Sequence, residues 1–335
     1  MAPGSPAAEG VCMPAIDFVA DVHGYADHLE ELLKKLGYRY RNGAYRHSDP
    51  NRMAVSVGDL MDRGPRQFDS IDIFRRMRDA GTGTALMGNH EHAAIGWIMP
   101  DELVPGNFLR KRSEKNYRQH KAFLDQIGEG SDLHRELVAW MITMPIIFDG
   151  EGVRAAHACW DPKALLSFDR NFSADASLPL DVLLRTYVKE SWEQDAIDQI
   201  LRGPEVDLPE GVSYLDAQGT RRTTSRLRWW DETLTTYRDG AITDDVSFEQ
   251  IPLTPLPEES LIVDRDPRPM IFGHYWLPGE PKLLSGRRAC LDFSVAAGGP
   301  LVAYQWDGEE TLMAENLVSV GGPDLAVEKA MAFGG

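Results

Sequence analysis

Long apolar runs are missing from this sequence of 335 residues, although 43% of its residues are hydrophobic. No stretch approaches the ~18 apolar residues that a membrane-spanning helix needs, so we expect no membrane segment and no membrane partner. The first ten residues, MAPGSPAAEG, lack the basic start and the apolar stretch of a signal peptide. These absences predict a cytoplasmic protein.

Cysteine is also scarce, with Cys12, Cys159 and Cys290 placed far apart. An odd number of widely spaced cysteines makes no disulfide framework and is typical of reduced thiols in the cytoplasm. Net positive charge is absent as well, since the formal charge is −17 at pH 7. Because a phosphate backbone needs a basic surface, nucleic acid is excluded as a general partner.

What the sequence does contain is an alternation of strand and helix patterns in its first ninety residues. Three short apolar segments have the length of buried strands, at 15–20, 53–58 and 84–88. Between them lie two amphipathic helices, the first ended by Gly37 and the second opened by Pro65. A β-α-β-α-β order predicts a mainly parallel sheet covered by helices.

The rest of the chain is expected to belong to the same domain, residues 13–320, between tails at 1–12 and 321–335. An insertion at about 165–268 is rich in loops, because its periodicity is weak beyond residue 203. The patterns predict helices at 131–144 and 181–201, strands at 153–156 and 269–273, and antiparallel strands between residues 289 and 320.

Five predicted strands end in polar residues that commonly bind metals. In α/β sheets ligands bind at the carboxyl ends of strands, so these side chains should meet in one crevice. Oxygen and imidazole donors suit Mn²⁺, Fe or Zn²⁺, and burying such groups without a cation would be costly. The residues at the strand ends are Asp21 with His23, Asp59, Asn89, His157 and His274.

The motifs around these residues carry a family resemblance. In chain order they are DVHG (21–24), GDLMDRG (58–64), GNHE (88–91), HACWDP (157–162) and GH (273–274). Together they resemble the calcineurin-like metallophosphoesterases, and the bacterial type of the phosphoprotein phosphatase branch most of all. The resemblance implies an α/β sandwich in which central mixed β-sheets are flanked by helices, here with a loop-rich insertion.

The resemblance also implies two divalent metal ions, with Mn²⁺ expected first and Fe, Zn or Ni as alternatives. The ions would share one carboxylate and a bridging hydroxide that attacks phosphorus in line. Mapped by motif, the first ion would be held by Asp21, His23 and Asp59, and the second by Asp59, Asn89, His157 and His274.

Three further residues receive roles in catalysis from the same motifs. His90 would protonate the leaving oxygen, which needs an imidazolium near neutral pH. Asp62 would hold His90 and stabilise its charge. Arg63 would bind phosphate oxygens through its planar guanidinium, together with Asn89. A second phosphate-binding arginine is expected from residues 223–231, where we favour Arg228 over Arg226.

The substrate is left open between two phosphate-containing classes. The first expectation is a phosphomonoester, with Ser/Thr or Tyr phosphoproteins included. The alternative is symmetrical hydrolysis of a dinucleoside polyphosphate such as diadenosine tetraphosphate. Met87 stands where eukaryotic protein phosphatases have arginine, and Trp160 and Trp276 could stack a base, which favours the alternative; Glu91 favours the first.

A third possibility is a non-catalytic binding protein on the same fold. Such a protein would lose metal ligands or the acid, whereas every one of them is present here. The remaining histidines lie in polar stretches and are expected on the surface. They are His28, His47, His92, His120 and His134.

Overall fold

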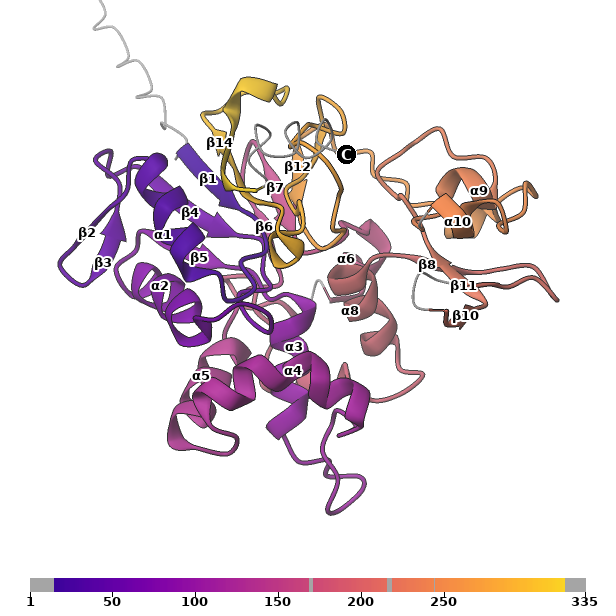
Figure 1. Cartoon of the computed structure of the whole chain (residues 1–335), viewed down its shortest axis with the longest axis horizontal. Helices are drawn as coiled ribbons and strands as arrows, with labels where there is room; N and C mark the ends of the chain where they lie inside the picture. Colours follow the sequence, from indigo (N-terminus) through magenta and orange to yellow (C-terminus); the bar gives the residue numbers. More distant parts are fainter. Residues whose placement is uncertain (1–14, 169–170, 216–218, 244, 323–335) are drawn as a thin grey trace, which may run out of the picture.

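Two β-sheets form the centre of the computed structural model, which describes residues 15–168, 171–215, 219–243 and 245–322 (Figure 1). The predicted tail 1–12, most of the predicted tail 321–335, and Cys12 lie outside the described residues. The first sheet has the strand order β15-β14-β1-β4-β5. Its strands are β1 (Ala15–Val19), β4 (Arg52–Ser56), β5 (Gly83–Ala85), β14 (Pro300–Trp306) and β15 (Leu317–Gly321).

The first sheet confirms the predicted β-α-β-α-β order. β1 pairs with β4, and β4 with β5, all in parallel. The crossovers carry α1 (Ala26–Lys35) and α2 (Gln67–Asp79), and the expected stripe of α1, with Leu29 and Leu32, is buried. At the other edge β14 pairs antiparallel with β1, and β15 pairs antiparallel with β14, as predicted.

The second sheet has the order β13-β12-β7-β6. Its strands are β6 (Ile147–Asp149), β7 (Arg154–Ala156), β12 (Met270–Phe272) and β13 (Arg288–Cys290). The prediction of an antiparallel strand after residue 289 was wrong there, because β13 runs parallel to β12. The connection from 273 to 287 is long enough to return the chain to the starting end of β12, which a parallel pair requires.

The two sheets are in contact through their side chains. Phe18 of β1 and Phe148 of β6 meet edge to face, with ring centroids 5.8 Å apart. Both sheets therefore share one large apolar core, which continues under the surrounding helices. A small hairpin is formed by β2 (Arg39–Arg41) and β3 (Ala44–Arg46), and Tyr45 of β3 belongs to the same core.

Helices cover the sheets, and none in the described part of the chain is both long and apolar enough to cross a membrane. The predicted helix at 131–144 is present, but that at 181–201 is two helices. The break occurs where Glu190 adopts a positive φ and Ser191 caps the second helix through Gln194 N–H. Besides α1 and α2, the helices before residue 205 are α3 (Asn89–Ile98), α4 (Glu114–Ile127), α5 (Asp132–Ile142), α6 (Pro162–Phe168), α7 (Leu180–Arg185) and α8 (Trp192–Arg202).

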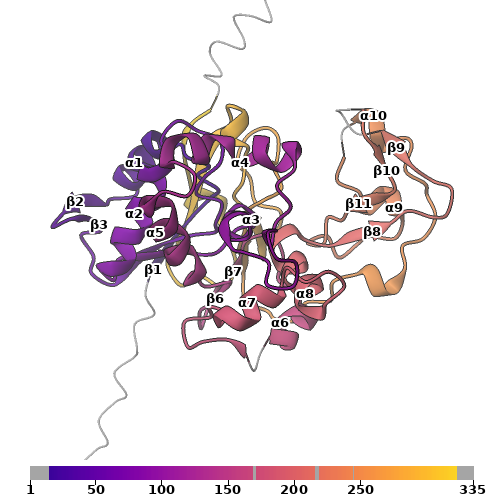
Figure 2. The same cartoon turned by 90° about the horizontal axis from the view of Figure 1, so that it is seen from below.

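Residues 205–263, which we call the 205–263 segment, lie beside the sheets with α6 and α8 nearest to them (Figures 1 and 2). They have a small apolar core of their own, to which Leu227, Tyr237 and Ile251 belong. The limits of the predicted insertion, about 165–268, remain a prediction. The elements of the segment are β8 (Glu205–Asp207), β9 (Tyr214–Leu215), β10 (Arg221–Arg222), β11 (Thr224–Arg226), α9 (Tyr237–Gly240) and α10 (Asp245–Phe248).

Candidate metal centre

The polar residues that follow β1, β4, β7 and β12 meet at one end of the two sheets, with the start of α3 beside them. All of the histidine and aspartate side chains expected as ligands are at least nine-tenths buried. The carboxyl ends of parallel strands point the same way, so local sequence order places these residues together. They are Asp21, His23, Asp59, His157 and His274.

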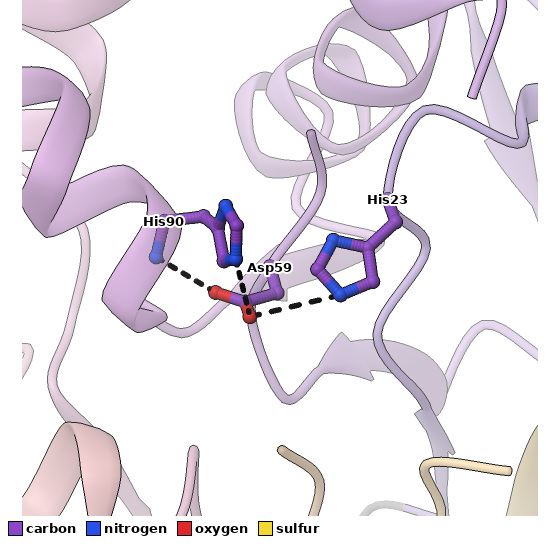
Figure 3. Close-up of side chains that lie close together, drawn as sticks. All are labelled: His23, Asp59 and His90. Atoms are coloured by element: carbon purple, nitrogen blue, oxygen red, sulfur yellow. Dashed lines mark hydrogen bonds and ion pairs between the residues drawn. The ribbon is translucent and has the colours of Figure 1, made fainter. Parts of the chain in front are cut away.

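Asp59 lies at the centre of this cluster. Its Oδ2 is 3.4 Å from Nε2 of His157, 3.8 Å from Nε2 of His23 and 3.9 Å from Nε2 of His90. Figure 3 shows the rings of His23 and His90 on either side of its carboxylate. Asp59 therefore belongs to two groups of potential metal ligands, one with His23 and His90 and one with His157 and His274.

The histidine rings are oriented with one nitrogen toward the cluster. Nδ1 of His23 lies 2.8 Å from the carbonyl of Met61, and Nδ1 of His157 lies 2.8 Å from the carbonyl of Val57. A ring that donates Nδ1–H to a carbonyl keeps a lone pair on Nε2. Nε2 of His23 and of His274 is buried and has no hydrogen-bond partner among the described residues. These donors fit a divalent cation.

The electrostatics of the cluster agree with this fit. Burial lowers the pKa of His23 to about 4, and it also lowers the pKa of His274. Both rings are therefore neutral, as metal ligands must be. Burial disfavours the imidazolium of His157, but Asp59, Asp21 and the carbonyl of Val57 together raise the pKa of His157 to about 10 in the absence of a cation. The carboxylates of Asp59 and Asp21 therefore favour a positive charge at the cluster, either a proton on His157 or a bound cation.

Asp21 belongs to neither of these two groups, and it is held by the loop after β12. Its Oδ2 accepts the backbone N–H of His274 at 3.1 Å. Gly273 is required here, because a Cβ on it would lie 1.9 Å from Oδ1 of Asp21. Burial, followed by the charge of Asp292, raises the pKa of Asp21.

Asp292 was not predicted as part of the site. It is buried and accepts the backbone N–H groups of Trp276 and Ser294, both at 2.9 Å. It lies in the stretch read as an alternating antiparallel strand, where a polar residue is expected to face solvent. No local sequence signal distinguishes it from a surface carboxylate.

Glu91 connects the two central motifs. Its Oε2 accepts the N–H groups of Asp59 and Gly88 at 2.9 Å, and its Oε1 accepts the N–H of Leu60 at 2.7 Å. A side chain on Gly88 would place Cβ 2.2 Å from Oδ1 of Asp59. A buried carboxylate and a glycine therefore keep the loop after β4 against the start of α3.

The proposed acid is held as the motifs imply. Nδ1 of His90 lies 2.6 Å from Oδ2 of Asp62, and the His90 side chain is 12% exposed. Burial disfavours the imidazolium, but the charge of Asp59 and the hydrogen bond to Asp62 raise the pKa of His90. Arg63 lies on the same loop and donates Nη1–H to the carbonyls of Asp62 and Gln119, both at 3.1 Å.

The prediction of surface histidines was wrong for His92, His120 and His134, which are buried. His120 even reaches the site, with Nδ1 2.7 Å from Oδ1 of Asp62. Helical spacing could have revealed two of them. His120 and His134 each begin a buried i, i+3, i+4, i+7 stripe, which continues with Phe123, Leu124 and Ile127 in α4 and with Leu137, Val138 and Met141 in α5.

The contacts of Arg228 are with residues of the 205–263 segment, and its role in phosphate binding stays a prediction. β11 ends at Arg226, and the chain then turns, so that Arg228 pairs its backbone with Gly240 and donates Nη2–H to the carbonyl of Asp239. The charge of Arg226 is among the causes that lower the pKa of His274, after burial and His157.

The two tryptophans near the ligand histidines differ in position. Trp276 is 42% exposed, and its ring lies 6.1 Å from that of His23. Trp160 is buried and packs beneath the guanidinium of Arg154. Only Trp276 of these two is therefore available to a substrate at the metal centre.

Comparisons with known proteins agree with the motifs. A family model described as calcineurin-like phosphoesterase matches residues 14–208, more than half of the chain. A protein of Oceanobacillus iheyensis named bis(5'-nucleosyl)-tetraphosphatase PrpE (asymmetrical) is 45% identical over 75 residues, which are 22% of this chain and 30% of that protein. The protein of the same name from Bacillus subtilis is 37% identical over 76 residues, 23% of this chain and 31% of that protein. The chain thus spans less than a third of the length of these relatives.

Among solved structures, a cold-active protein-tyrosine phosphatase of a Shewanella species is similar, with a TM-score of 0.47 and 18% identity. The match covers 90% of this chain and 81% of that one. At this level the likeness carries no argument about function. The family match covers more than half of the chain, and it shows that the chain belongs to the calcineurin-like phosphoesterase family.

Proposed function

We propose that this protein is a phosphatase that hydrolyses phosphomonoesters, phosphoproteins included, at a centre of two divalent cations. The observation that supports it most is the position of Asp59, whose Oδ2 faces histidines of both ligand groups. Asp21, His23 and Asp59 would hold one ion, and Asp59, Asn89, His157 and His274 the other. Mn²⁺, Fe, Zn or Ni fits this mixture of oxygen and imidazole donors.

Two divalent cations bound there would lower the pKa of a water molecule and offset the negative charge of the phosphate. His90 would supply the proton that the leaving oxygen needs. Its Nδ1 donates to Asp62, so the proton to be transferred is on Nε2, the nitrogen that faces Asp59. The raised pKa of His90 keeps that proton available near neutral pH.

Arg63 would bind the phosphate oxygens. Among the described residues its hydrogen bonds go to two carbonyl groups and both use Nη1, so the donors on Nη2 and Nε would serve a substrate anion. Asn89 would contribute from the start of α3, where its Oδ1 lies 3.2 Å from Nε2 of His157. For the second arginine we now propose Arg226 in place of Arg228.

A second candidate function is hydrolysis of a dinucleoside tetraphosphate. The names of the curated relatives and the exposed ring of Trp276 beside His23 favour it. Those names specify asymmetrical cleavage, so asymmetrical products are expected instead of the symmetrical products of our sequence-based alternative.

Product analysis separates these candidates. The Mn²⁺-loaded protein would be offered diadenosine tetraphosphate and a phosphopeptide mixture separately, with the Asp59→Asn variant as a control for contaminating phosphatases. Free phosphate from peptides, with the dinucleotide intact, is the expected result. ATP with AMP from the dinucleotide alone would establish the second candidate, and two ADP would establish the symmetrical reaction. No product from either substrate would refute both proposals.

A further inference from the structure

Asp62 has two histidine partners, and only one of them belongs to the family motifs. His90 binds Oδ2 of Asp62 at 2.6 Å, and His120 of α4 binds Oδ1 at 2.7 Å. The second contact joins residues that are 58 positions apart in the sequence. Both oxygens of the Asp62 carboxylate therefore have a histidine partner. Oδ2 contacts His90, the proposed acid, and Oδ1 contacts the buried ring of His120.

The ring of His120 is held by packing. It is fully buried and stacks on Phe123, with ring centroids 4.9 Å apart, and its ring lies 5.8 Å from that of Trp97. Its Nε2 has no hydrogen-bond partner among the described residues. The contact with Asp62 is thus the one hydrogen bond recorded for this ring there, and Nδ1 carries the proton that Asp62 accepts.

The same turn of α4 also contacts Arg63. The carbonyl of Gln119 accepts Nη1–H of Arg63 at 3.1 Å. On the other side, the backbone N–H of Asp62 donates to Oε1 of Gln67 at 2.7 Å. Asp62 itself has a φ of 85°, a conformation that aspartate rarely adopts without support. Helix α4 therefore braces the loop that carries both residues.

A carboxylate with one hydrogen bond can rotate about its Cβ–Cγ bond, whereas bonds to both oxygens determine its plane. We propose that His120 is a positioning residue, which orients the Asp62 carboxylate so that His90 presents its Nε2 proton to the leaving oxygen. The inference rests on the proposed role of His90. A displacement of about 1 Å at such a group can reduce a rate by roughly 10²-fold.

The test compares three variants on two substrates. His120→Leu removes the donor, and His120→Asn retains an N–H at about the position of Nδ1. His134→Leu is the matched control, since His134 is an equally buried histidine that packs on Phe123 but has no recorded contact with Asp62. The substrates are phenyl phosphate, whose leaving group needs a proton, and 2,4-dinitrophenyl phosphate, whose leaving group does not.

For His120→Leu we expect kcat to fall about 10- to 100-fold on phenyl phosphate, with metal content and kcat on the dinitrophenyl ester nearly unchanged. His120→Asn should recover most of the lost rate, and His134→Leu should not discriminate between the substrates. An equal loss on both substrates in His120→Leu would reduce His120 to a structural role and overturn the inference.

Two further variants, His120→Gln and His90→Asn, are measured on the same two substrates. If His120→Leu does not fold, His120→Gln replaces it, because its longer side chain puts the donor beyond the position of Nδ1; equal selectivity of the Gln and Asn variants would overturn the inference. His90→Asn is measured beside them. Without selective loss in His90→Asn the proposed role of His90 fails, whereas selective loss there but not in His120→Leu refutes only the role of His120.

Discussion

The metal centre and the 205–263 segment bury very different side chains. The metal centre buries carboxylates and imidazoles, with Asp59 within 4 Å of three histidine rings. In the described part of the 205–263 segment, the buried polar residues are only Ser225 and Ser247, and the core is apolar. One region concentrates charge and the other excludes it.

The backbone differs in the same way. Three proposed metal ligands and Asp62, the partner of the proposed acid, have positive φ angles, which non-glycine residues adopt at a cost of about 1–3 kcal/mol each. They are His23 (49°), Asp59 (53°), Asp62 (85°) and His274 (75°). No non-glycine residue has a positive φ in the described part of the 205–263 segment. Strain and buried charge together therefore mark the place of the chemistry, while the segment follows ordinary packing rules.

The largest effect is expected from Asp59→Asn. Removing the shared carboxylate should lower the occupancy of both metal ions and reduce activity by about 10³-fold or more, because the cations contribute several kcal/mol to the reaction. Elemental analysis and turnover measure this, with Asp69→Asn on the surface of α2 as the control. Full occupancy of both ions would contradict the shared position of Asp59.

The next effect is that of His90→Asn, which leaves the proposed ligands intact. Turnover of esters with poor leaving groups should fall roughly 10²- to 10⁴-fold, the range of general acid catalysis, while metal content stays normal. Steady-state kinetics with elemental analysis checks both statements. An unchanged rate would remove His90 from the mechanism.

A smaller effect is expected from Arg63→Ala, which removes charged donors but no proposed metal ligand. Hydrogen bonds to a charged group contribute about 1.5–3 kcal/mol, so the inhibition constant for free phosphate should rise roughly 10- to 100-fold. Arg75→Ala is a matched control, since Arg75 pairs with Glu136 on the surface. Equal inhibition of both variants would argue against phosphate binding by Arg63.

The smallest effect on the metal centre is expected from the 205–263 segment. Ile251 is fully buried in its core, so Ile251→Ala should destabilise that core by about 2–5 kcal/mol, and Ile251→Val by about 0.5–1.5 kcal/mol. Hydrogen exchange within the segment measures this. Metal content should not change, because no proposed metal ligand lies in the segment, and a loss of metal would show that the two regions are not independent.

Much of the metal centre could be predicted because its residues are local extensions of strands. Asp59 follows β4 and His274 follows β12, so a correct prediction of each strand also predicts the position of its ligand. The contacts of His120 and Asp292 could not be predicted in this way. Each depends on how a helix or loop from a distant part of the chain packs, and neither residue belongs to a motif.

By itself, the sequence determined the order of the parallel strands, the polar residues at their ends and hence the kind of chemistry, since strand periodicity and motif spacing are properties of neighbouring residues. Tertiary structure alone decided that Asp62 has a second histidine, that Arg228 contacts Asp239 and Gly240, and that β13 runs parallel to β12. These features depend on contacts between segments far apart in the chain, whose free energy no local pattern records.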